Sequence, residues 1–227
     1  MKTSYVLLAT VAAVTLTGLV ATDVLLKQQY DKIDWSDRYR TFERRALPSA
    51  RHLVIEAAPV AEIIVEKNAR PHALVDAAYV GFYRTRQRGD TLFVTLTPDF
   101  DGRNDPKNNA SAELRTGLVL RLPGLQSLRV RNGRLTIRDF TLNQLAVSLR
   151  GSRLRTNQLT VRDSFTLTES GNSFAVLGAD RYQSLRVAVR DSSGLQLDNA
   201  EAGSFTAEVS PKAEVQLRGR ALRWLAK

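Results

Sequence analysis

The sequence predicts an all-β fold, a parallel β-solenoid with rungs of about twenty residues, preceded by one N-terminal transmembrane or signal helix. First, apolar and polar residues alternate in short bursts beyond Pro48, as strands require because successive side chains point to opposite faces. Second, these bursts recur about every twenty residues in the carboxyl-terminal half, a period typical of stacked units. Third, residues 3–22 form an uncharged, largely apolar run.

The apolar run near the amino terminus is long enough to cross a bilayer, because twenty helical residues rise about 30 Å. Lys2 precedes the run, so a cleavable signal peptide is the alternative. Leu19 interrupts the small-x-small pattern of a cleavage site that would end at Ala21, which favours an uncleaved anchor. Under either interpretation the body is exported if the amino end stays inside.

The chain is expected to have three parts. Residues 1–27 form the membrane anchor or signal segment, 28–50 a juxtamembrane linker, and 51–227 a β-solenoid ectodomain. In the linker, Tyr30, Trp35 and Tyr39 lie where aromatic side chains would sit at a membrane interface. A short segment that packs on the body is the alternative interpretation.

The twenty-residue repeat contains two apolar bursts. The first bursts begin at Leu145, Phe165, Leu185 and Phe205. The second bursts contain Leu154, then Phe174 with Val176, then Leu195 with Leu197, and last Val215 with Leu217. Leucine-rich repeats share this period, but they use one strand, a helical return and an asparagine in phase. Here a second strand occupies the return, which predicts rungs of two or three strands.

Two positions conflict with a regular repeat. The Asn132-Gly133 pair is a strong signal for a two-residue hairpin, which predicts an irregular first rung. Glu169 falls where a core residue is expected, so its strand should shift its face or end early. At the end of the chain, Leu222, Trp224 and Leu225 lie among positive charges. This segment is interpreted as a cap over the last rung, with an interaction tail as the alternative.

A family resemblance rests on several segments. They are 30–34 (Tyr-Asp-Lys-Ile-Asp), 53–55 (Leu-Val-Ile), 89–94 (Gly-Asp-Thr-Leu-Phe-Val), 122–128 (Leu-Pro-Gly-Leu-Gln-Ser-Leu) and the β-repeats. Together these segments resemble the auto-transporter adhesin head GIN domain family of bacterial envelope proteins. The resemblance covers most of the chain past residue 28 and is one of pattern, without a catalytic signature. It implies an exported β-solenoid of Gram-negative bacteria with no established activity.

Positive charge is concentrated in one part of the chain. The net charge is +10 and the pI about 10.3, and residues 125–162 hold eight arginines against one acid, Asp139. Arginine suits carboxylate, phosphate and sulfate partners because its planar fork donates paired hydrogen bonds. Alternation turns the arginines outward, and stacked rungs would gather them into an anion-binding stripe. The predicted stripe comprises Arg129, Arg131, Arg134, Arg153 and Arg155. The alternative is a solvated basic face without a partner.

Signatures of catalysis and metal binding are not found in the sequence. Cysteine is absent, which excludes disulfides, thiolate metal sites and cysteine nucleophiles. His52 and His72 lie in no metal-binding spacing, and no nucleophile elbow or phosphate loop occurs. The acidic cluster Asp99, Asp101 and Asp105 is interpreted as a polar turn, with a calcium site as the alternative. We therefore predict no enzyme activity, no cofactor and no metal.

These observations predict a non-catalytic, membrane-anchored binding or adhesin-like module of the bacterial cell envelope, in the periplasm or on the surface. Its expected partners are the membrane, through the N-terminal helix, and an anionic glycan, lipid headgroup or envelope protein. Nucleic acid is not expected, because an exported body seldom meets it. The alternatives are a structural scaffold that self-stacks, or a polysaccharide-acting β-helix enzyme. The ligand and the oligomeric state are left open.

Overall fold

In the computed structural model, the described residues are 2–31, 38–98 and 115–226. The chain divides into two compact units, Met1–Arg40 and Thr41–Lys227, and each is described by itself. The first contains helix α1 (Lys2–Asp31). Within it, the hydroxyls of Thr10, Thr15, Thr17 and Thr22 each donate a hydrogen bond to the carbonyl four residues earlier. A threonine hydroxyl bonded in this way leaves no unpaired donor in an apolar medium.

Helix α1 fits a bilayer by length and composition. Among the described residues, one helical stretch, Tyr5–Asp31, is long and apolar enough to cross a membrane, and a signal sequence would pass the same test. Exposed side chains cover the described part of its surface, with Leu8 71% exposed. The helix is therefore compatible with both an uncleaved anchor and a leader.

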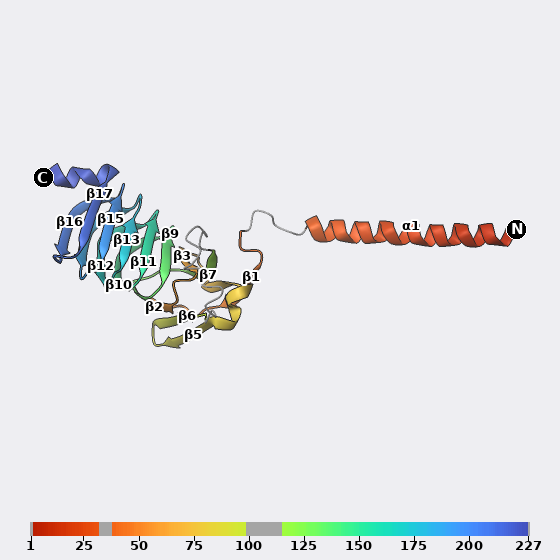
Figure 1. The fold of residues 1–227 in the computed structure, drawn as a ribbon, viewed down its shortest axis with the longest axis horizontal. Coiled ribbons are helices and arrows are strands. Elements are labelled where there is room, and N and C mark those ends of the chain that lie inside the picture. Colours follow the sequence, from red (N-terminus) through yellow and green to blue (C-terminus); the bar gives the residue numbers. More distant parts are fainter. Residues whose placement is uncertain (1, 32–37, 99–114, 227) are drawn as a thin grey trace. The chain divides into compact units, whose positions relative to one another are not determined.

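The second unit consists of strands arranged in two sheets (Figure 1). The strands are β1 (Phe42–Ala46), β2 (His52–Ala57), β3 (Glu62–Lys67), β4 (His72–Asp76), β5 (Tyr83–Arg88), β6 (Thr91–Leu96), β7 (Thr116–Leu122), β8 (Ser127–Arg131), β9 (Arg134–Arg138), β10 (Thr141–Arg150), β11 (Arg153–Asn157), β12 (Thr160–Ser170), β13 (Phe174–Leu177), β14 (Arg181–Val189), β15 (Gly194–Asp198), β16 (Glu201–Val209) and β17 (Glu214–Arg218). The described residues of this unit also form the 3-10 helices η1 (Ala77–Phe82) and η3 (Gly219–Ala226).

The two sheets are mixed, so the prediction of a single parallel β-solenoid is wrong. The nine-stranded sheet has the order β1-β4-β7-β3-β9-β11-β13-β15-β17, and the eight-stranded sheet has the order β16-β14-β12-β10-β8-β2-β6-β5. Three pairs are antiparallel, β1 with β4, β4 with β7 and β5 with β6. The tight turn at Gly89, with φ +59°, joins β5 directly to β6 and so forces an antiparallel pair. The expectation of an all-β body is confirmed.

The twenty-residue repeat correctly identifies neighbours in the carboxyl-terminal half. Strands β10, β12, β14 and β16 pair in parallel, and Leu145, Phe165, Leu185 and Phe205 are in register with one another. In the second set of strands, β13 buries Ala175 and Leu177, whereas Phe174 and Val176 lie on the outer face. The Phe174 ring extends over Gly194 of the next strand, where a Cβ would lie 2.9 Å from the ring. The second burst thus has its face shifted by one residue at β13.

The Asn132-Gly133 pair forms a corner, and the predicted hairpin is not formed. It connects β8 in one sheet to β9 in the other, and Asn132 has a left-handed φ of 55°, which asparagine tolerates better than most residues. Serines follow at the equivalent corners. The Gly133 N–H donates to Ser152 Oγ at 3.3 Å, the Ser152 N–H to Ser173 Oγ at 3.2 Å, and the Ser173 N–H to Ser193 Oγ at 3.1 Å. This serine ladder satisfies backbone donors that the corners bury.

The main core lies between the two sheets and is made of inward-facing aliphatic side chains, with Phe140 and Phe165 among its largest. Glu169 interrupts it. The strand neither shifts its face nor ends early there, because β12 continues to Ser170 and Glu169 is 0% exposed. The sequence-based expectation for this strand is therefore wrong, and a carboxyl group lies in the core.

The carboxyl-terminal end of the core is covered only in part. The rings of Trp224 in η3 and Phe205 in β16 stack with their centroids 5.1 Å apart, and Ala221 is fully buried. This agrees with the interpretation of the terminal segment as a cap. Ala207 and Val209 lie at core positions further along β16, yet both are exposed, Val209 by 46%. Their counterparts on β14, Val187 and Val189, are buried.

Candidate binding groove

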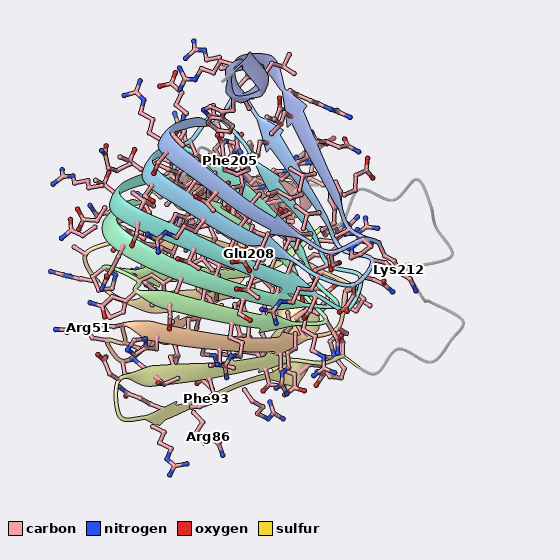
Figure 2. The ribbon with its side chains drawn as sticks, turned by 90° about the vertical axis from the view of Figure 1, so that its left-hand side faces the viewer. Arg51, Arg86, Phe93, Phe205, Glu208 and Lys212 are labelled. Carbon is pink, nitrogen blue, oxygen red and sulfur yellow. The ribbon has the colours of Figure 1, made fainter. Side chains whose placement is uncertain are left out.

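A groove of about 680 Å³ lies on the outer face of the eight-stranded sheet. It crosses β5, β6, β2, β8, β10 and β12, which lie side by side in that order. Figure 2 shows this sheet with Arg86 and Phe93 at its β5 end and Phe205 and Glu208 at its opposite end. The groove therefore occupies the half of the sheet nearer β5.

Strand register explains the shape of the groove. At one level across the sheet, the outward residues are in-register neighbours, in the order Phe93, Val54, Arg129, Ser148 and Thr168. The shorter Val54 on β2 thus separates the larger Phe93 on β6 from Arg129 on β8, and the short Ser148 and Thr168 follow on β10 and β12 beyond Arg129. Because outward side chains stand roughly perpendicular to a sheet, the short ones form the floor and the long ones the walls.

The β5 end of the groove is defined by Arg86 and Phe93. They are direct cross-strand partners, and the guanidinium carbon of Arg86 lies 5.1 Å from the centroid of the Phe93 ring. This cation–π contact favours one position of an otherwise mobile side chain. It leaves the guanidinium hydrogen-bond donors at the edge of the groove.

Arg129 and Arg131 supply the positive charge at the middle of the groove. Both are exposed on β8, where the alternating residues Leu128 and Val130 are buried. Among residues 38–98 and 115–226, the guanidinium groups of Arg86, Arg129 and Arg131 have no ion pair or hydrogen bond. Three cationic groups without carboxylate partners therefore surround one groove.

Two further titratable residues line the groove. His52 Nδ1 lies 2.7 Å from Ser127 Oγ on the adjacent strand, and the direction of this bond depends on the histidine tautomer. Glu56 is the in-register neighbour of Arg131 and is exposed. Glu56 lowers the positive charge beside Arg131, so the net charge of the lining comes chiefly from the three arginines.

The predicted stripe of five arginines is divided between the two sheets. Arg129 and Arg131 lie on β8 in the eight-stranded sheet, whereas Arg134 lies on β9, and Arg153 and Arg155 lie on β11, all in the nine-stranded sheet. The corner at Asn132 separates the two groups. Sequence reasoning missed Arg86 and Phe93, although the alternation of exposed arginines at 84, 86 and 88 already indicated a basic strand.

Arg134 and Arg153 are in-register neighbours on the outer face of the nine-stranded sheet. Burial, and secondarily the nearby charge of Arg153, lowers the pKa of Arg134 below its ordinary value. Its Nε is buried and donates to no partner within the described chain. Arg134 and Arg153 thus repel one another, and neither these two arginines nor Arg155 lines the groove described above.

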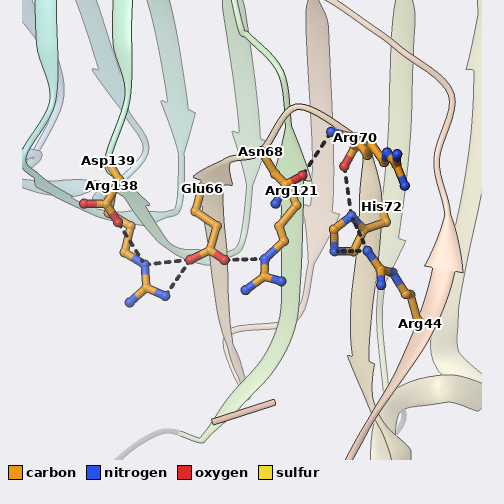
Figure 3. Close-up of polar contacts among 8 residues, drawn as sticks. All are labelled: Arg44, Glu66, Asn68, Arg70, His72, Arg121, Arg138 and Asp139. Carbon is orange, nitrogen blue, oxygen red and sulfur yellow. Dashed lines mark hydrogen bonds and ion pairs between the residues drawn. The ribbon is translucent and has the colours of Figure 1, made fainter. Parts of the chain in front are cut away.

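In a second basic cluster, on the nine-stranded sheet, the side chains are bonded to one another within the protein (Figure 3). Glu66 accepts a hydrogen bond from Arg121 Nε at 2.5 Å and from Arg138 Nη2 at 2.5 Å. His72 is 4% exposed, and its Nδ1 lies 2.9 Å from the Arg70 carbonyl oxygen. Arg44 Nη2 lies 3.3 Å from His72 Nε2. Charge-assisted bonds from Glu66 on β3 to Arg121 on β7 and Arg138 on β9 thus connect three neighbouring strands of the sheet.

The described residues contain no group of three or more histidine, cysteine, aspartate and glutamate side chains that could hold a metal ion. The acidic cluster Asp99, Asp101 and Asp105 lies outside the described residues. The interpretation of that cluster as a polar turn stays a prediction.

Comparison with known proteins finds similarity in structure only. No family model matches the sequence, and no curated protein matches it. A "putative adhesin" from Bacteroides fragilis has 12% identity and a TM-score of 0.37, over 79% of this chain and 98% of that chain. A "putative adhesin" from Parabacteroides distasonis has 9% identity and a TM-score of 0.40, over 79% and 94%. A "putative lipid binding protein" from the same species has 13% identity and a TM-score of 0.35, over 79% and 95%.

These likenesses are distant and identify no function for this chain. Their descriptions name adhesins and a lipid-binding protein but no GIN domain. The finer family resemblance therefore stays a prediction.

Proposed function

We propose that the protein is a non-catalytic binding module of the bacterial cell envelope, held to the membrane by α1, whose groove takes an anionic ligand. The observation that carries this proposal is the set of Arg86, Arg129 and Arg131, which surround one groove without carboxylate partners. An acidic glycan, a lipid headgroup and an acidic patch on an envelope protein share the required chemistry.

The lining supports binding of an extended anionic group. Arginine donors suit carboxylate, phosphate and sulfate oxygens, the hydroxyls of Ser148 and Thr168 offer neutral hydrogen bonds, and Phe93 offers an apolar face. Charge-assisted hydrogen bonds contribute about 1.5–3 kcal/mol each when they are sheltered from water. Because the groove is open, salt should screen part of this attraction.

Two matched double variants test the groove. R129Q/R131Q removes two exposed arginines from the groove, and R153Q/R155Q removes two exposed arginines from β11 on the other sheet. The full-length protein in detergent would be applied to immobilised acidic and neutral glycans. A separate arm would use vesicles of anionic or zwitterionic lipid.

The groove proposal has distinct outcomes in this experiment. We expect R129Q/R131Q to weaken binding to an acidic probe about tenfold or more, which corresponds to about 1.4 kcal/mol, while R153Q/R155Q binds as the parent does. Equal weakening by both variants would show that only total charge matters. Binding to no acidic probe would reject the proposed function.

Binding without turnover is the favoured form of this function. The common form of glycoside hydrolysis uses two carboxyl groups, and Glu56 is the one carboxyl among the described residues that line the groove. Mass spectrometry of any bound glycan after prolonged incubation would reveal cleavage. A cleaved product would favour the polysaccharide-acting enzyme instead.

A further inference from the structure

The two ends of the eight-stranded sheet differ in charge. Strand β5 forms one edge and β16 the other. Exposed Arg84, Arg86 and Arg88 alternate along β5, whereas β16 carries Glu201 and Glu208 and no basic residue. Figure 2 shows Arg86 and Glu208 toward these opposite ends of the sheet.

The β16 edge is less protected than a sheet edge usually is. Natural edges are blunted by charged side chains, lysine above all, by proline or by a covering segment. On β16, Phe205 is covered by the Trp224 ring of η3. The four residues that follow Phe205, at positions 206–209, are all exposed. Ala207 and Val209 lie in line with the core residues Val187 and Val189, so the end of the apolar core is open beside a strand edge.

The β5 edge has complementary chemistry. Arg86 and its cross-strand partner Phe93 point to the outer face of the sheet. Glu208 points to the same face, because it is connected to that row by the in-register residues Ala188, Thr168 and Ser148. In a sheet that continued from β16 into β5 of another copy, Glu208 and the β5 arginines would therefore lie on one face. Oppositely charged side chains on neighbouring strands attract one another and stabilise the pairing.

We propose that β16 of one copy binds β5 of a second copy of this chain, edge to edge. With both copies in the same direction, β5 runs antiparallel to β16, because β5 is antiparallel to β6 and the intervening strands are parallel. The contact pairs unpaired backbone groups and covers Ala207 and Val209. It is heterologous, so it leads to open-ended growth. The proposal is independent of ligand binding in the groove.

The chain contains no cysteine, so introduced cysteines report this contact without interference. A disulfide forms only where Cα atoms come within about 4.4–6.8 Å. Full-length E208C protein in detergent would be mixed with full-length R84C, R86C or R88C protein and oxidised gently. We expect a disulfide-linked heterodimer in at least one mixture, and no dimer from any of the four variants alone.

Each result of the crosslinking decides the proposal. A dimer from E208C alone would show β16 paired with β16 of another copy and would overturn it. The proposal would also be overturned if none of the mixtures crosslinks and sedimentation gives a monomeric mass at every concentration. These failures leave the groove proposal intact, because they do not involve glycan or lipid binding.

Charge reversal supplies a second measurement. We expect E208R to weaken concentration-dependent association at least severalfold, and added salt to weaken association of the parent protein. E214R changes an exposed glutamate on the neighbouring strand β17 of the other sheet and should leave association unchanged. Equal loss in both variants would show that the β16 edge is not the specific contact.

Discussion

Glu169 lies in register with Leu149 of the adjacent strand, and both side chains are buried in the core. Neither carboxylate oxygen of Glu169 has a hydrogen-bond partner in the described chain. Burial in apolar surroundings disfavours the charged form and raises the pKa of Glu169 to about 8. Burial of the Glu169 carboxyl group therefore opposes folding.

Glu169→Leu should stabilise the protein. Leucine would continue the aliphatic row of Leu149 and remove an unsatisfied polar group, which costs about 1–3 kcal/mol when buried. We expect a gain of that order in the free energy of unfolding, measured by urea denaturation of the full-length protein in detergent. Glu214→Leu, at an exposed position, should change stability by less than about 0.5 kcal/mol. A loss of stability in the Glu169 variant would contradict the interpretation of Glu169 as unsatisfied.

The same carboxyl predicts a pH dependence. Its pKa is about 8 in the folded protein against 4.5 as the ordinary value, so the folded state holds the proton more tightly. Its contribution is therefore most favourable below about 4.5 and is lost as the pH rises through about 8. The stability advantage of Glu169→Leu over the parent should widen across this window in denaturation curves. Asp180, whose pKa is also raised by burial, is present in both proteins and cancels.

The sequence predicted neighbours along the repeat but not the whole sheet topology. The spacing of Leu145, Phe165 and Leu185 was sufficient because each parallel pair repeats the same step. The apolar residues of β4 indicate a buried strand, but they carry no information on which strand is the neighbour or in which direction it runs. The antiparallel pairs of the amino-terminal half were therefore not predictable from periodicity.

Glu66 should be necessary for stability because it pairs with two arginines. Burial raises its pKa, but hydrogen bonds from Arg121 and Arg138 outweigh burial and hold the pKa below the usual range. We expect Glu66→Gln to lower the free energy of unfolding by about 1.5–3 kcal/mol, the value of hydrogen bonds to charged groups. A group with a lowered pKa contributes above its unfolded pKa, so the difference from the parent should shrink on acidification. A difference that stays constant with pH would indicate that the charge of Glu66 contributes nothing.

Only some of the residues that line the groove could be predicted from the sequence. Alternation placed Arg129 and Arg131 outward, as the structure does. The five predicted arginines lie on two different sheets because the chain turns a corner at Asn132. That corner could not be predicted, because an Asn-Gly pair also fits a hairpin. Phe93 lies two strands and Arg86 three strands from Arg129 in the sheet, but both are about forty residues from it in the chain, so no local pattern connects them.

Gly178→Ala should destabilise the contact between β11 and β13. A Cβ at Gly178 would lie 2.6 Å from the backbone carbonyl oxygen of Thr156, which accepts a hydrogen bond from the Gly178 N–H at 3.2 Å. Backbone cannot move aside as a flexible side chain can, so we expect a loss of about 1–3 kcal/mol, the usual cost of overpacking. Gly124→Ala is the matched control, because nothing lies within 4 Å of its Cβ position. Both changes restrict the unfolded chain alike, so equal stabilities in denaturation would mean that the strands separate at Gly178 without cost.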